Sequence, residues 1–176
     1  QRVGGDGLLI HPVLGQKQPG DFNQEAILKG YEALINTDFP SEGSLLNGFF
    51  GNSWYAGPRE AVFTAICRRN FGCSHFVVGR DHTGVGDFYK PTDVEALFDR
   101  LGDIGIEPVF FNEVVFDPKE NRCREVGSTE DNSGLNRISG TIIRNHIING
   151  EAPPPWMMRP EVSQALLGII SEGRKV

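Results

Sequence analysis

Residues 79–87 (GRDHTGVGD) place one arginine, one histidine, two aspartates and three glycines directly after a short apolar segment. The planar guanidinium of Arg80 suits the oxygens of a phosphate or sulfate, and Gly79 lets the backbone approach a ligand closely. Asp81 can accept hydrogen bonds from ribose hydroxyls, while His82 can donate to an anion or transfer a proton. The alternative is a polar surface turn. The motif is neither GxGxxG nor GxxxxGK[ST], so neither of those mechanisms applies.

A second cluster, Asn52–Glu60 (NSWYAGPRE), runs from an expected strand end into the start of an expected helix. Free backbone N–H groups and the helix dipole favour an anion at such a place, and Arg59 adds a positive charge. Trp54 and Tyr55 could wall a pocket. The alternatives are simple packing of the two aromatic side chains and ion pairing of Arg59 and Glu60 with their neighbours.

Three further residues are candidate anion contacts. Ser139 precedes an expected helix and Arg144 lies about one turn inside it, so the two could hold a phosphate, although Ser139 could equally cap the helix. His11 ends the first expected strand, where a packed and hydrogen-bonded histidine is the alternative. We expect no covalent nucleophile, no metal-ligand cluster and no protein-bound cofactor. Residues of these types fit nucleotidyl or phosphoryl transfer, in which positioning and charge stabilisation do most of the work.

Alternating strand-like and helix-like segments must position these clusters. Strands are expected over Gly7–Val13, Leu45–Phe50, His75–Val78, Glu107–Phe111 and Val114–Phe116, and helices over Phe22–Thr37 behind Asp21, over Pro58–Asn70, and from a capping box at Thr92–Glu95 to Leu101. This βαβ rhythm predicts a Rossmann-like α/β fold with a parallel sheet and helices on both faces. Ligands of such sheets bind outside the carboxyl ends of the strands, so the strand-end loops should gather at one edge.

The last third of the chain follows another pattern. The polar segment Asp117–Asn136 is expected to be irregular. Helices are expected over Ser139–Asn149 and Pro160–Glu172, with three prolines between them as a stiff spacer. The sequence therefore predicts an α/β domain over residues 1–116 and a small α-helical C-terminal subdomain over residues 117–176.

Composition limits the class of protein. The chain has 176 residues, of which 39% are hydrophobic and 23% charged, and a net charge of −6, which argues against a general nucleic-acid binder. Its three cysteines lack the spacing of a disulfide framework or a zinc site. No apolar run approaches the length of a membrane helix, so we expect a cytoplasmic protein without membrane or nucleic-acid partners. The first residue is Gln1 and the only methionines are Met157 and Met158, so we expect upstream sequence that is not shown.

Several motifs together resemble the catalytic part of the ATP sulfurylase (sulfate adenylyltransferase) family. They are, in order, GLLIHPVLGQ, AGPREA, GRDH, FFNEVVF, ISGTIIR and PPPWMMRPEV, and they cover essentially the whole chain. AGPRE and GRDH at this spacing are far more specific than either motif alone. The resemblance implies the nucleotidylyltransferase type of α/β fold. It also implies transfer of an adenylyl group from Mg·ATP to sulfate, giving adenylyl sulfate and pyrophosphate, or the reverse, in an enzyme expected to be a homo-oligomer.

The resemblance also implies roles for individual residues. The residues expected to contact the nucleotide are Gly79, Arg80, Asp81, His82, Phe111 and Val114. Among these, Arg80 and His82 are the expected catalytic residues, and Val114 matches the position that holds adenine through its backbone. Thr83 stands where the family usually has an alanine whose backbone N–H binds sulfate, so the amide is kept and bulk is added.

The chain departs from the family pattern in two ways that affect the expected site. Ser53 and Trp54 replace a Met-Arg pair that usually precedes Tyr55, and neither a QxRNP segment nor an HxxH-type pair occurs in the chain. We therefore expect a C-terminal fragment that binds adenine nucleotide weakly and is inactive without the remainder of the enzyme. The alternatives are a nucleotidylyltransferase that acts on another acceptor and a non-catalytic nucleotide-binding subunit.

Overall fold

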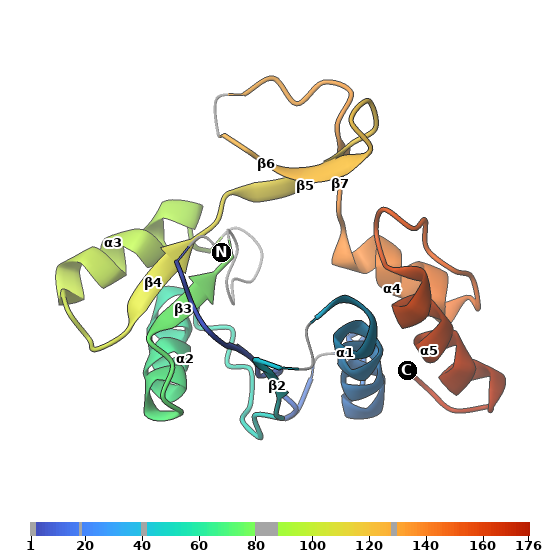
Figure 1. Cartoon of the computed structure of the whole chain (residues 1–176), viewed down its shortest axis with the longest axis horizontal. Coiled ribbons are helices and arrows are strands. Elements are labelled where there is room, and N and C mark those ends of the chain that lie inside the picture. Colours follow the sequence, from blue (N-terminus) through green and yellow to red (C-terminus); the bar gives the residue numbers. More distant parts are fainter. Residues whose placement is uncertain (1–2, 18, 40–41, 80–87, 128–129) are drawn as a thin grey trace. The chain divides into compact units, whose positions relative to one another are not determined.

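The computed structural model describes residues 3–17, 19–39, 42–79, 88–127 and 130–176 (Figure 1). It has the α/β class that the sequence predicted, with helices and parallel strand pairs. The backbone divides into two compact units, one made of residues 1–53, 118–122 and 136–176 and the other of residues 54–117 and 123–135. The predicted domain boundary after residue 116 stays a prediction.

The first unit contains a parallel strand pair and three helices. Strand β1 (Leu8–Ile10) pairs with β2 (Ser44–Leu46), with Leu8 opposite Ser44 and Ile10 opposite Leu46. The helices are α1 (Gln24–Asp38), α4 (Gly140–Ile148) and α5 (Pro160–Ser171), and α5 packs against both others. Their shared core consists of Ala26, Ile147, Leu166 and Ile169. This unit also includes the short strand β7 (Asn136–Arg137).

The second unit builds a strand pair against two helices. Strand β3 (His75–Val78) pairs in parallel with β4 (Glu107–Phe110), and α2 (Pro58–Asn70) and α3 (Pro91–Leu101) lie beside them (Figure 1). Phe76 and Val78 point to the same face of β3, because strand side chains alternate, and they share a core with residues of both helices. Val77 points to the opposite face and is 59% exposed.

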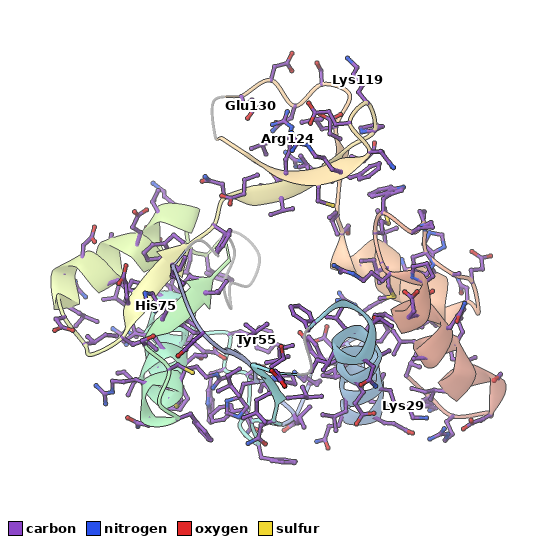
Figure 2. The ribbon with its side chains drawn as sticks, in the orientation of Figure 1. Lys29, Tyr55, His75, Lys119, Arg124 and Glu130 are labelled. Carbon is purple, nitrogen blue, oxygen red and sulfur yellow. The ribbon has the colours of Figure 1, made fainter. Side chains whose placement is uncertain are left out.

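The segment after β4 corrects one prediction. Residues 117–136 are not irregular throughout, since β5 (Glu113–Asp117) hydrogen-bonds to β6 (Arg122–Val126). The connecting turn is too short for a parallel crossover, so the two strands form an antiparallel hairpin. In the loop after β6, the Glu130 carboxylate accepts a hydrogen bond of 2.6 Å from Nη1 of Arg124 (Figure 2). Nε of Arg124, on β6, also donates to the Asp117 carboxylate of β5 over 3.4 Å, and such a polar pair across the hairpin helps to explain how a hydrophilic segment forms a strand.

Two helix starts also differ from the sequence prediction. Asn23, and not Asp21, caps α1: its side-chain oxygen accepts a hydrogen bond of 2.9 Å from the Ala26 N–H. Helix α3 begins at Pro91 behind Lys90, whose N–H donates to the Asp93 carboxylate over 2.8 Å, so the predicted cap at Thr92 is wrong. Proline at the first helical position explains the earlier start. In the part of the chain that the structure describes, no helix is long and apolar enough to cross a membrane.

Candidate functional site

The carboxyl ends of β3 and β4 bring together two of the predicted nucleotide-contacting positions. Gly79 directly follows β3 and is exposed. The Phe111 N–H donates a hydrogen bond of 3.1 Å to the Val78 carbonyl, so Phe111 is held beside the residue that precedes Gly79. Arg80, Asp81, His82 and Thr83 lie outside the described residues. At the described part of this edge, β3 therefore ends in an exposed glycine, which is the first residue of the GRDH motif.

Beyond this edge, β5 presents one candidate residue outward. Val114 is 41% exposed, whereas its neighbours Val115 and Phe116 are buried at 0% and 8% exposure. Asn112, in the turn between β4 and β5, donates its N–H to the Glu125 carboxylate over 3.3 Å. This hydrogen bond ties the turn to β6. Phe111 and Val114 are thus close in sequence on either side of a tied turn.

The segment before α2 is built around a buried carboxylate. Glu60 is 6% exposed, and its two carboxylate oxygens accept hydrogen bonds of 3.1 Å from the Trp54 N–H and 2.9 Å from the Ala56 N–H. These bonds fold the residues before the helix back over its first turn. Glu60 therefore has a structural role, as one alternative from the sequence allowed, and its partners here are backbone N–H groups; its place in the third helical position was the available signal.

Two residues of this segment adopt left-handed backbone conformations. Tyr55 has φ of 53° and Gly57 has φ of 57°, the second being the N-cap of α2. A Cβ on Gly57 would lie 2.3 Å from Cδ2 of Tyr89, so the Tyr89 ring rests directly on the Gly57 backbone. Only glycine suits both the conformation and the close approach. Tyr89 is not among the residues predicted from the sequence, because the contact joins residues far apart along the chain.

The predicted anion contact Arg59 is exposed and lines a hollow of about 610 Å³ with residues of α3. Trp54 is 68% exposed and does not line this hollow. Arg59 therefore faces a concave surface of the second unit.

The strand ends of the first unit are closed by packing. The ring of His11, 9% exposed, makes an edge-on contact with the ring of Phe49 at a centroid distance of 5.3 Å. The pairing continues past β1 and β2, since the Leu14 N–H donates to the Phe49 carbonyl over 2.8 Å. A Cβ on Gly15 would lie 1.9 Å from the Gly51 carbonyl oxygen, so the two backbones touch. The packing of the His11 ring agrees with one part of the alternative that the sequence left open, and the role of His11 as an anion contact stays a prediction.

Ser139 and Arg144 are engaged in local contacts within the first unit. The Ser139 hydroxyl accepts a hydrogen bond of 3.4 Å from the Ile142 N–H and caps α4. Arg144 lies 3.7 Å from the Asp21 carboxylate and donates to the Thr141 hydroxyl over 3.3 Å. Capping is thus one role of Ser139, and Asp21 offsets part of the charge of Arg144. A role for either residue in binding an anion stays a prediction.

Lys17 is a basic residue that the sequence analysis missed. Burial lowers the pKa of its ammonium group, and the nearby Asp21 carboxylate opposes that shift. Because Asp21 also lies 3.7 Å from Arg144, its carboxylate interacts electrostatically with two cationic side chains in this region. Among the described residues, no group of three or more histidine, cysteine or acidic side chains is arranged to hold a metal ion.

The comparisons with known proteins point to one family. The family model for ATP-sulfurylase matches residues 1–168. A sulfate adenylyltransferase of Staphylothermus marinus is 46% identical over 171 residues, and one of Pyrococcus abyssi is 46% identical over 168 residues. These alignments cover 93% and 92% of this chain but 43% of each relative. The chain thus spans less than half the length of the curated relatives that it matches.

A solved structure supports the fold. A hexameric APS kinase from Thiobacillus denitrificans has a TM-score of 0.67 with this chain at 23% sequence identity, covering 91% of this chain and 30% of the other. At this identity the likeness concerns the fold alone.

Proposed function

Since this chain belongs to the ATP-sulfurylase family, we propose that it is part of a sulfate adenylyltransferase that joins ATP and sulfate to give adenylyl sulfate and pyrophosphate, or catalyses the reverse reaction. The observation that carries the proposal is the hydrogen bond of 3.1 Å between the Phe111 N–H and the Val78 carbonyl. This hydrogen bond supports the proposal because it joins Phe111 to the residue before Gly79 where two parallel strands end, and ligands of α/β folds usually bind at such ends.

In the proposed reaction a sulfate oxygen attacks the α-phosphorus of ATP, and the bond between the α-phosphorus and the bridging oxygen breaks. Pyrophosphate leaves with that oxygen. The transition state carries extra negative charge on the α-phosphoryl oxygens and on the leaving group, so positioned cations lower the barrier. We assign this stabilisation to Arg80 and His82, which follow Gly79 directly.

The remaining assignments concern binding. Gly79 and Asp81 contact the nucleotide, Val114 holds the adenine through its backbone, and the Thr83 N–H binds sulfate. Exposure of Gly79 and Val114 in the structure is compatible with these roles. ATP enters as its magnesium complex, in which the ion is carried by the nucleotide phosphates.

We expect the chain to need the rest of the protein for turnover. It spans 43% of the length of its relatives, and no QxRNP segment occurs among its residues. The 176-residue chain is therefore expected to bind ATP weakly and to release negligible pyrophosphate. A homo-oligomeric, cytoplasmic enzyme is part of the same proposal.

The test compares the full-length protein with this chain. Pyrophosphate release from ATP is measured with sulfate, with molybdate and with organic phosphates as acceptors. Full-length protein should respond to sulfate and molybdate, and Arg80→Ala should lower its kcat/KM about a hundredfold or more, as removal of one transition-state donor does. Arg122→Gln, an exposed cation outside the site, is the control.

Two results would contradict the proposal. A response to an organic phosphate, with none to sulfate, would indicate a nucleotidylyltransferase for another acceptor. No turnover by the full-length protein with any acceptor, together with measurable ATP binding, would indicate a non-catalytic nucleotide-binding subunit.

A further inference from the structure

The hollow beside Arg59 has the size of a small-molecule site. Its volume is about 610 Å³, within the range of about 300–1,000 Å³ that is usual for such pockets. One wall is a single face of α3, formed by Asp93, Ala96, Leu97 and Arg100, which recur at helical spacing. The opposite wall is the start of α2. All of these residues belong to the second unit, so the hollow is complete within it.

Two arginines give the hollow its charge. Arg59 contributes one guanidinium from α2 and Arg100 another from α3, and both side chains are exposed. Within the described part of the chain, neither guanidinium forms an ion pair or a hydrogen bond. Asp93 is the one acid among the lining residues, and its carboxylate already accepts the Lys90 N–H over 2.8 Å. The lining therefore has an excess of positive charge and donors that are available to an oxyanion.

The rest of the lining is apolar and includes a flat ring. Tyr89, 43% exposed, faces the hollow with Leu97 and Pro58. The ring of Tyr89 is held in place because it rests on the Gly57 backbone, where a Cβ would lie 2.3 Å from its Cδ2. Ala96 adds a small apolar side chain to the same lining. A ligand for this hollow would need an anionic end for the arginines and a flat apolar body for the ring.

We propose that this hollow binds a small phosphate or sulfate monoester with an aromatic body. The two guanidiniums bind the oxyanion, and the body of the ligand lies against Tyr89 and Leu97. The proposal goes beyond the adenylyl transfer proposed above and does not depend on it, because no lining residue belongs to β3, β4 or the GRDH segment. Arg59, predicted from sequence to contact an anion, would do so here.

Phenyl phosphate is a suitable probe, since it combines the two required features in the smallest form. We would titrate it into the isotope-labelled 176-residue chain and follow the side-chain Nε–H signals of Arg59 and Arg100 by NMR. Both signals should shift and saturate together. Arg59→Gln and Arg100→Gln should each weaken binding about tenfold, as expected for loss of a charge-assisted hydrogen bond.

Three controls separate this site from others. Arg122→Gln removes an exposed arginine elsewhere and should leave the affinity unchanged. Ala96→Leu fills the hollow without changing charge or helix propensity much, and it should abolish binding while the chain stays folded. Arg80→Gln alters the predicted nucleotide site and should leave binding of phenyl phosphate intact.

Comparison of related small molecules defines the class of ligand. Phenol should not bind, and inorganic phosphate should bind more weakly than phenyl phosphate. Tighter binding of AMP through the same two arginines would identify the ligand as a nucleoside phosphate, and weaker binding would identify a simpler aryl ester. The proposal is overturned if phenyl phosphate fails to saturate, or if Arg80→Gln removes its binding while Arg59→Gln and Arg100→Gln do not.

Discussion

The two parallel strand pairs have similar ladders and different carboxyl ends. After β1 and β2 the backbones stay in contact, because the Leu14 N–H bonds to the Phe49 carbonyl and Gly15 touches Gly51. After β3 and β4 the last backbone bond joins Phe111 to Val78, and Gly79 is exposed with no described atom within 4 Å of the place a Cβ would take. Strand pairing alone does not create a ligand site. The described backbone packs tightly after β1 and β2, whereas after β3 it does not crowd Gly79, which is the difference that a proposed ligand site requires.

The largest effect is expected for Gly15→Ala. The new methyl group would lie 1.9 Å from the Gly51 carbonyl oxygen, and the neighbouring backbone must move apart. We expect a loss of about 3 kcal/mol in the free energy of unfolding, which lowers Tm by roughly 10 °C in a chain of this size. Gly168→Ala, in α5 with open space around it, is the matched control and should leave Tm unchanged or higher. Equal Tm values for both variants would contradict a closed first strand end.

Gly57→Ala tests whether the segment before α2 is as tightly built as the first strand end. Alanine is disfavoured at φ of 57° and would place its methyl group 2.3 Å from Cδ2 of Tyr89. We expect a loss of about 2 kcal/mol in thermal or urea unfolding. In a double-mutant cycle, Tyr89→Ala should restore part of that loss by removing the clash. Strict additivity of the two substitutions would show that the ring does not rest on Gly57.

Glu60→Gln tests the buried carboxylate that folds the same segment. Glutamine keeps one acceptor oxygen and loses the charge, so the hydrogen bonds from Trp54 and Ala56 are weakened. The urea midpoint should fall by the equivalent of about 1 kcal/mol, and Glu60→Ala should cost more because both N–H groups lose their acceptor. An unchanged midpoint in both variants would exclude the proposed role of the carboxylate.

Gly79→Ala should have little effect on stability and a clear effect on ligand binding. A Cβ at this position meets no described atom within 4 Å, so the change in unfolding free energy should stay below about 0.5 kcal/mol. In the full-length protein, the same methyl group should weaken ATP binding several-fold, because it separates the backbone from the nucleotide. Calorimetric titration measures the affinity. A destabilised variant with unchanged ATP affinity would show that the chain is tightly packed after β3, as it is after β1 and β2, and that Gly79 does not contact the nucleotide.

The smallest effect concerns the hairpin of β5 and β6, which belongs to neither strand pair. Two hydrogen bonds lower the pKa of the Glu130 carboxyl below its ordinary value of 4.5. The one from the Arg124 side chain has the larger effect, and the one from the Gly127 N–H has the smaller. The stabilisation is complete above the ordinary pKa and is lost as the pH falls through the lowered value of the folded state. Carboxyl NMR signals should show Glu130 titrating at lower pH than it does after Arg124→Gln. The NMR signals of residues at the carboxyl ends of both parallel strand pairs should be unchanged by Arg124→Gln.

The sequence predicted the regular elements where local signals agree. Pro58 at the first helical position and Gly72 after the helix defined α2, and its predicted bounds match the structure. The start of α1 was missed because Asp21 and Asn23 are both good caps, and the spacing of apolar residues does not choose between them. Strand β6 was missed because three of its five residues are charged and its pairing with β5 is the stabilising factor.

The candidate site was predictable in its residue types and less so in its geometry. GRDH and AGPRE identified the loops, and the family assignment confirms the resemblance on which their roles rest. The contacts of Gly57 with Tyr89 and of Gly15 with Gly51 join residues far apart in sequence, and no local pattern encodes them. The hollow of Arg59 and Arg100 has the same origin, since it depends on how α2 and α3 pack.

The pairing of β1 with β2, which are separated in the chain by α1, also has a consequence for the order of events during synthesis. The ribosome releases β1 first and then all of α1, whose first turn is complete once the Ile27 N–H bonds to the Asn23 carbonyl over 3.0 Å. Strand β2 emerges only after α1, so this helix is available on the nascent chain before β1 can pair with β2. A translational pause before β2 has emerged would leave the edge of β1 that pairs with β2 exposed, and the nascent chain could then misassociate through it.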